Sequence, residues 1–105
     1  MIEKPKPLLV HDTTRVLYAN ELACALFGCD LLTLSARQVV ELVIADEFRK
    51  LIDVHMRILR ERGSSPDIEY PFLRCDMTVF YAKTYSVRLE QDLFSMALTK
   101  TFEWW

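Results

Sequence analysis

His55 is the side chain of this 105-residue chain whose type and setting best suit chemistry. It stands among apolar residues at helical spacing, with Phe48, Ile52 and Leu59 on the same face of a predicted helix. An imidazole in that position can act as a ligand to a cofactor. It can also be a core histidine that hydrogen bonds to a backbone carbonyl or to a neighbouring hydroxyl. The sequence leaves both interpretations open.

His11 and Asp12 are the other pair of residues that could carry chemistry, because an adjacent histidine and carboxylate would suit a catalytic pair. Neighbouring residues of a strand, however, point to opposite faces. Moreover, no serine or thiol is arranged with the pair to serve as a nucleophile. We therefore expect this chain not to be an enzyme.

The three cysteines, Cys24, Cys29 and Cys75, form no Cys-x-x-Cys pair and are not clustered with histidines, which argues against a zinc site. Their odd number, together with the compartment inferred below, argues against a disulfide framework. We expect ordinary reduced thiols that are buried as small apolar side chains.

Composition bounds the class of protein and its partners. A hydrophobic content of 51% with few Gly and Pro predicts a folded domain, and 105 residues suffice for one core. We expect a single domain over residues 1–105 with its core at about 7–102. The net charge of −2 argues against a nucleic-acid partner. Because the chain has no long apolar run and no apolar leader, we expect a cytoplasmic protein with no membrane partner.

The first elements are two short strands and a helix. Residues 7–11 are apolar and end at an Asp turn, and Val16 and Tyr18 alternate in a second strand. Asn20 is placed to cap a helix that runs to Gly28.

The remainder predicts short helical turns, a long helix and three strands. Over residues 30–42 we expect short helical turns with Ser35 as a cap. From Asp46, apolar residues at helical spacing predict a helix of about four turns that ends at Gly63. Its expected apolar positions are Phe48, Leu51, Ile52, His55, Ile58 and Leu59. Residues 68–72, 79–89 and 93–102 read as strands, and Pro71 places the first of these at an edge or a bulge.

This order of elements resembles a PAS domain, the sensory and dimerisation module of signalling proteins, over nearly the whole chain. The positions that match are Asp12, Tyr18, Asn20, Leu26, Phe27, Gly28, the long helix ending at Gly63, and the Asp76 turn. The resemblance implies an α+β fold, in which a five-stranded antiparallel sheet has short helices and one long helix packed on one face. In both Asp turns the family usually has Gly next, whereas this chain has Thr13 and Met77. Those turns must avoid positive φ or accept a cost of about 1 kcal/mol.

Strand alternation together with the resemblance predicts a ligand pocket between the long helix and the sheet. Matching from the Asp76 turn puts Phe80, Ala82, Thr84 and Ser86 on the inner face. Small hydroxyl side chains there leave volume and hydrogen-bonding groups for a small ligand, unless bulky helix side chains fill the space. The expected pocket residues are Phe48, Ile52, His55, Leu59, Phe80, Thr84, Ser86, Met96 and Leu98.

The other face of the same strand is apolar and aromatic, which is typical of a partner surface. PAS domains commonly bury this outer face against a second PAS domain or a flanking helix, so we expect a homodimer. The expected interface residues are Val79, Tyr81, Tyr85, Val87, Leu89, Trp104 and Trp105.

The resemblance also bears on cofactors. Haem-binding PAS domains take a ligand from a histidine on the long helix, but near Ile52, about one turn before His55. Flavin photosensors carry a cysteine in a motif that aligns with residues 36–41 here, where there is none. We therefore expect no covalent flavin photochemistry, and the cofactor is left unknown.

The sequence thus predicts a sensory PAS domain that binds a small molecule or a partner protein and signals through its outer sheet face to an effector outside this chain. Two alternatives remain: a haem or redox-cofactor sensor that uses His55, and a purely structural dimerisation module with a filled core.

Overall fold

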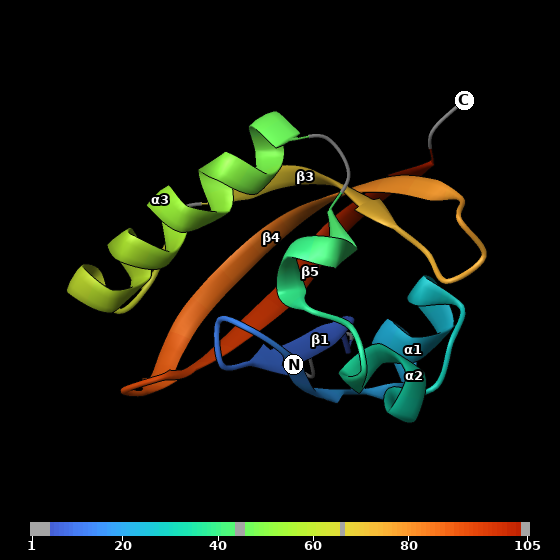
Figure 1. Ribbon diagram of the computed structural model, residues 1–105, viewed down its shortest axis with the longest axis horizontal. Helices are drawn as coiled ribbons and strands as arrows, with labels where there is room; N and C mark the ends of the chain where they lie inside the picture. Colours follow the sequence, from blue (N-terminus) through green and yellow to red (C-terminus); the bar gives the residue numbers. More distant parts are fainter. Residues whose placement is uncertain (1–4, 44–45, 66, 104–105) are drawn as a thin grey trace.

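The computed structural model describes residues 5–43, 46–65 and 67–103, and the fold is an antiparallel sheet with its helices inserted between the second and third strands (Figure 1). The elements in chain order are β1 Leu8–His11, β2 Val16–Ala19, α1 Glu21–Phe27, α2 Leu31–Ser35, the 3₁₀ helix η1 Val39–Leu42, α3 Asp46–Arg62, β3 Ile68–Leu73, β4 Val79–Glu90 and β5 Leu93–Glu103. No helix in these ranges is long and apolar enough to cross a membrane.

The sheet has five strands in the order β2-β1-β5-β4-β3, and every neighbouring pair is antiparallel. The expected α+β class and the five-stranded antiparallel sheet are therefore confirmed. The last strand, β5, inserts between β1 and β4, which joins the N-terminal hairpin to the C-terminal strands. β3 lies at an edge, where Pro71 is tolerated because an edge strand has one unpaired side.

Asn20 fixes the step from the β1–β2 hairpin into α1. Its side-chain oxygen accepts hydrogen bonds from the N–H groups of Ala23 (2.9 Å) and Leu8 (3.1 Å), and its amide donates to the carbonyl of Lys6 (2.8 Å). One residue thus caps the helix, as predicted, and also ties it to the edge of β1. Gly28 ends the helix with φ of 73°.

The short helices begin differently from the prediction. Ser35 is not a cap: it is the last residue of α2, and its hydroxyl donates to the carbonyl of Leu32. Asp30 caps α2 instead, with its side-chain oxygen 2.9 Å from the Thr33 nitrogen. Gln38 stands at the start of η1. Ser and Asp are both favoured at a helix N-cap, so the residue types alone could not select between Ser35 and Asp30, and the tertiary structure decides.

The predicted long helix is confirmed as α3, and Gly63 ends it with φ of 82°. Its buried face differs in part from the prediction. Ile52 and Leu59 are buried, whereas Leu51 is 42% exposed. Met56 joins the inner face instead, because residues 52, 55, 56 and 59 form one continuous stripe at 3.6 residues per turn.

β4 alternates as predicted. Phe80, Ala82, Thr84 and Ser86 are buried, while the residues between them are partly or fully exposed. The register assigned from the sequence is therefore right, and one face of the sheet carries the core.

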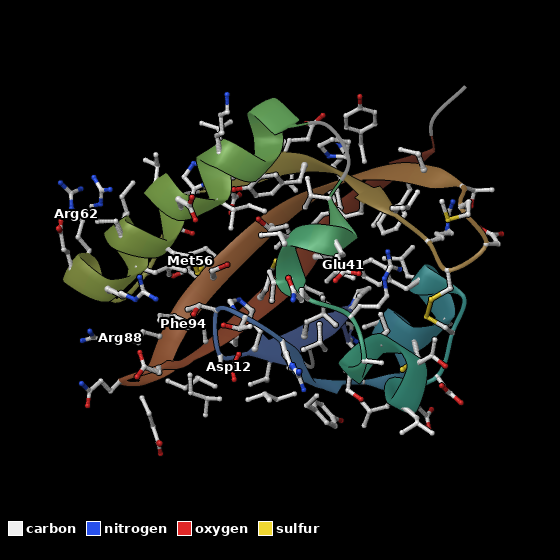
Figure 2. The ribbon with its side chains drawn as sticks, in the orientation of Figure 1. Asp12, Glu41, Met56, Arg62, Arg88 and Phe94 are labelled. Carbon is white, nitrogen blue, oxygen red and sulfur yellow. A yellow bond between two sulfur atoms is a disulfide. The ribbon has the colours of Figure 1, made fainter. Side chains whose placement is uncertain are left out.

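The expectation of reduced thiols is wrong for two of the three cysteines. Cys29, just after α1, forms a disulfide with Cys75 in the β3–β4 turn, and the bond is drawn in yellow in Figure 2. An odd count requires only that one cysteine stay free, and that residue is Cys24. The two partners are 46 residues apart, so no local pattern could have paired them.

Candidate ligand-binding site

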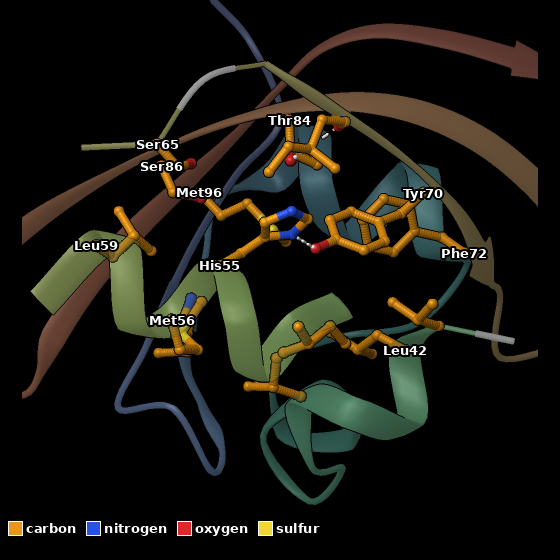
Figure 3. Close-up of a pocket in the computed structure, with 15 residues that line it drawn as sticks. Leu42, His55, Met56, Leu59, Ser65, Tyr70, Phe72, Thr84, Ser86 and Met96 are labelled. Atoms are coloured by element: carbon orange, nitrogen blue, oxygen red, sulfur yellow. Dashed lines mark hydrogen bonds between the residues drawn. The ribbon is translucent and has the colours of Figure 1, made fainter. Parts of the chain in front are cut away.

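A cavity lies between α3, η1 and the inner face of the sheet (Figure 3). It measures about 30 Å³ as the space open to the centres of water-sized molecules, which is room for about two waters. Its walls are mainly apolar and include Val39, Leu42, Val43, Ile52, Leu59 and Met96.

Six of the nine expected pocket residues line this cavity: Ile52, His55, Leu59, Thr84, Ser86 and Met96. Two others lie elsewhere in the core. Phe80 packs in an aromatic cluster 5.2 Å from the ring of Phe27 and 5.5 Å from that of Phe72, and Leu98 is buried away from the cavity lining. Phe80 precedes Ser86 by six residues, which is about 20 Å along a strand. The side chain of Phe48 lies outside what the structure describes. Ligand binding by these residues stays a prediction.

Three polar lining residues were not predicted, namely His11, Tyr70 and Ser65. Alternation gave a signal for the first two, because His11 shares a strand face with Leu9, and Tyr70 with Phe72. Ser65 follows α3 in a loop, and no periodic pattern points to it.

His55 on α3 and Tyr70 on β3 form a pair across the cavity. The Nδ1 atom of His55 and the hydroxyl of Tyr70 share a hydrogen bond, and the two rings meet edge to face with centroids 5.7 Å apart (Figure 3). Burial lowers the pKa of His55 and raises that of Tyr70. Both side chains are therefore uncharged at neutral pH, and the core interpretation of His55 matches this geometry.

His11 is 2% exposed and stacks on Phe94 at a centroid distance of 5.7 Å. Burial lowers its pKa from 6.5 to about 4, and the nearby charge of Asp12 opposes that shift only in part. The neutral ring accepts a hydrogen bond at Nδ1 from the N–H of Thr13 (3.1 Å). Its own hydrogen consequently sits on Nε2.

Hydroxyl groups supply the remaining polarity. Thr84 donates to the carbonyl of Ile68 (3.1 Å), so its hydrogen is already used. Ser65 and Ser86 are each 5% exposed, and their backbones are joined by a 3.1 Å bond from the N–H of Ser65 to the carbonyl of Ser86. Figure 3 shows the two side chains next to each other. Neither hydroxyl hydrogen bonds to any residue in the described part of the chain.

The cavity is uncharged. None of the residues that line it is Asp, Glu, Lys or Arg, and within the described ranges no group of three or more potential metal-ligating side chains occurs. The site can therefore enclose a small neutral molecule and offer hydrogen bonds to it, but it offers no counter-ion.

This architecture was compared with solved structures. A PAS domain of a LuxR-family transcriptional regulator from Burkholderia thailandensis, solved in complex with ethanol, superposes with a TM-score of 0.69 at 17% identity, over 91% of this chain and 91% of that one. The PAS domain of an HTR-like protein from Haloarcula marismortui gives 0.70 at 18% identity, over 93% and 82%. This chain has the PAS fold.

A third structure extends the PAS comparison. The LOV domain of a blue-light activated histidine kinase from Erythrobacter litoralis gives a TM-score of 0.67 at 15% identity, over 90% of this chain and 94% of that one. No protein-family model and no curated protein sequence matches this chain. At these identities the likeness concerns the PAS fold and not the ligand.

The outer face of the PAS sheet carries the expected interface residues of β4. Tyr85 and Leu89 are 42% and 50% exposed, and Val79, Tyr81 and Val87 are partly buried. Trp104 and Trp105 lie outside the described residues. The apolar stripe also reaches strands that the prediction left out, because Val87 pairs with Ser95, Ser95 with Val10, and Val10 with Tyr18.

Proposed function

We propose that this PAS-fold chain is a sensory module that binds a small molecule between α3 and the sheet, and that it signals through its outer sheet face. The observation that carries the proposal is the uncharged internal cavity whose two serine hydroxyls have no partner in the described chain. These hydroxyls touch space that a water-sized molecule can reach, because no fully buried side-chain nitrogen or oxygen of the described residues lacks a partner, and a core that served packing alone would not need such polar space.

β4 is the natural route for the signal. Thr84 and Ser86 line the cavity, while Tyr85 and Val87 on the same strand face outward. A ligand acts only by favouring one arrangement of helix and sheet over another. Any shift of β4 on binding moves both faces at once, and a partner on the outer face would feel it.

The C-terminal end of α3 is tied to β4 and would move with it. The guanidinium of Arg88 donates to the carbonyl of Arg60 (2.6 Å), and the N–H of Arg88 donates to the carbonyl of Gly63 (2.8 Å). Ser65, which lines the cavity, follows two residues later. A short series of hydrogen bonds therefore connects the proposed ligand site, the C-terminal end of α3 and β4.

The comparisons support this function by analogy. One PAS-fold neighbour was solved with ethanol, which sets a precedent for a small neutral ligand, and another is the LOV domain of a histidine kinase. For this chain we propose an effector outside the sequence, a homodimer as the working form, and a cytoplasmic location. Because disulfides are rare in the cytosol, the Cys29–Cys75 bond gives that location a test: alkylation in intact cells should find these thiols largely reduced.

Haem was the alternative cofactor, and the residues do not fit it. The cavity of about 30 Å³ is far smaller than the several hundred Å³ that larger ligands occupy. A Soret band in the purified protein that disappears in His55→Ala would reverse this assessment.

A cavity-filling variant tests the sensory proposal. An NMR screen of small molecules at millimolar concentration is expected to find one that binds the protein, and Ser86→Leu is expected to abolish that binding because the new side chain fills the space. Ser95→Leu, on the outer face of β5, is the matched control and should keep the binding. A protein that binds none of these molecules and admits no xenon would favour the purely structural dimerisation module.

A further inference from the structure

Ser65 and Ser86 form a polar corner in an otherwise apolar cavity. Their hydroxyls have no hydrogen-bond partner among the described residues. Yet within these residues every fully buried side-chain nitrogen or oxygen has a hydrogen-bond partner. Both oxygens must therefore touch space that a water-sized molecule can reach. Each residue is only 5% exposed and lines the cavity, and from this we infer that the accessible space is the cavity.

From this arrangement we propose that the cavity binds a neutral molecule of two or three non-hydrogen atoms, whose hydrogen-bonding group is held by the hydroxyls of Ser65 and Ser86. The inference rests on the proposed function, because it names the ligand class of the same site. It adds the two residues that would recognise the ligand and the chemistry that they select.

The size of the ligand follows from the volume. A cavity of about 150 Å³ accepts benzene, and one water needs about 10–15 Å³. The roughly 30 Å³ found here leaves room for a molecule well below the size of benzene. At most about 1.5 kcal/mol per non-hydrogen atom is available to so small a ligand, so its dissociation constant is millimolar or weaker.

The neutrality of the ligand follows from the lining. An ion buried there would meet no opposite charge, and burying an unpaired ion is strongly unfavourable. A third polar group, the Nε2–H of His11, comes from β1 on the far side of β5 and is likewise unpaired among the described residues. The groups on offer are thus hydroxyls and a neutral imidazole, which suit an alcohol-like or amide-like ligand.

A matched set of probes tests the proposal on the intact chain. ¹H–¹⁵N NMR titrations would use methanol, formate and methylammonium, which are similar in size and differ in charge. Methanol is expected to cause saturable shifts at cavity residues, and the two ions are expected to cause none. Xenon serves as an apolar probe of whether the cavity admits any guest.

Serine variants test the recognition step. Ser86→Ala and Ser65→Ala are each expected to weaken methanol binding about three- to tenfold, as the loss of one hydrogen bond implies, and to leave xenon binding intact. Ser95→Ala, on the outer face, is the control and should change neither. A preserved amide spectrum shows that each variant folds.

The outcomes separate this inference from the proposed function. The inference is wrong, and the sensory function survives, if xenon enters but both serine variants bind methanol as tightly as the unmodified protein does. The same holds if formate or methylammonium binds as well as methanol. Ordered water alone in the cavity at any methanol concentration also overturns it. If neither xenon nor methanol enters, both proposals fall.

Discussion

Thr13 and Met77 hold a backbone conformation that residues with a Cβ rarely adopt, with φ of 78° and 70°. Each follows an Asp and precedes a Thr. The Asp12 side chain accepts from the N–H of Thr14 (2.9 Å), and that of Asp76 accepts from the N–H of Thr78 (3.0 Å). The Arg15 N–H donates to Asp12 (2.8 Å) and the Thr78 hydroxyl to Asp76 (2.5 Å), and these bonds, followed by the two from the N–H groups of Thr14 and Thr78, lower the pKa of both carboxyl groups and hold the turns in place. The chain thus keeps the turn geometry without Gly and accepts the strain.

Relief of that strain gives the first prediction. Thr13→Gly and Met77→Gly should each raise the free energy of unfolding by about 0.5–1 kcal/mol, because Gly adopts positive φ without a steric cost. Urea unfolding measures the change. Thr14→Gly is the control, since φ is not positive there, and it should destabilise the protein. A loss of stability in Thr13→Gly equal to that in Thr14→Gly would contradict the strain argument.

His11 gives a prediction about pH. Its pKa in the folded state is about 4, below the 6.5 of an exposed histidine, so the unfolded chain takes up the proton first as pH falls. Stability should be unaffected above pH 6.5 and should drop by about 3 kcal/mol between pH 6.5 and 4. His55, whose pKa is also lowered, changes stability in the same direction.

A variant that keeps a hydrogen-bond acceptor but cannot titrate isolates the contribution of His11. In His11→Asn the side-chain oxygen can take the place of Nδ1 as acceptor for the Thr13 N–H, but the residue no longer titrates. Its pH profile from 6.5 to 4 should be flatter than that of the unmodified protein in chemical denaturation. An unchanged profile would show that the imidazole is not shielded from water as the structure implies.

At the scale of elements, the end of α1 is fastened to the β3–β4 turn. The N–H of Cys75 donates to the carbonyl of Phe27 (2.9 Å), the Arg74 Nε donates to the carbonyl of Leu26 (2.9 Å), and the Cys29–Cys75 disulfide closes the same junction. Arg74 also lies over the ring of Phe80, 4.7 Å from its centroid. This junction joins two elements that are far apart in sequence and anchors the aromatic end of the core.

The disulfide is expected to contribute substantially to stability. It closes a loop of 46 residues, and loss of such a cross-link costs about 2–4 kcal/mol through the entropy of the unfolded chain. Reduction, or Cys29→Ser, should lower the melting temperature in differential scanning calorimetry. Cys24→Ser is the control: it keeps the disulfide, so its melting temperature should match that of the unmodified protein and should fall by the same amount on reduction, because Cys24 is free. Equal melting temperatures with and without reductant would mean that the bond does not form or does not stabilise the fold.

At the scale of the whole molecule, the sheet separates two surfaces. The inner face is covered by the helices and encloses the cavity, and the outer face presents the stripe formed by Val10, Tyr18, Tyr85, Val87 and Leu89. This stripe draws its apolar residues from three strands, with Ser95 of β5 between them, and it fits a flat partner such as the second copy of the chain that we propose.

The introduction of a charge on the outer sheet face tests self-association. Leu89→Glu and Tyr85→Glu should shift the sedimentation coefficient from dimer to monomer, because each buries a carboxylate in an apolar interface. Leu32→Glu on α2 is the control: Leu32 is 81% exposed but does not lie on the sheet, so association should persist. If the unmodified protein is a monomer at concentrations well above micromolar, the proposal of self-association through the outer sheet face is wrong.

Local sequence determines the helices and strands of this fold. Asn20 caps α1, Gly63 ends α3, and alternation along β4 puts Phe80, Ala82, Thr84 and Ser86 on one face, which the resemblance to PAS domains assigned to the inside. Each of these depends on residues within a few positions of one another, where backbone sterics and periodic burial act. That is also why six of the nine expected pocket residues could be placed beside the cavity.

Only the tertiary structure decided the rest. The Cys29–Cys75 bond, the His55–Tyr70 pair and the Ser65–Ser86 corner each join residues from different elements. Phe80 and Leu98 have the right face but the wrong position along their strands, and periodicity carries no information about that. Local patterns fix which face a side chain points to. The packing of one element on another fixes which side chain it meets there.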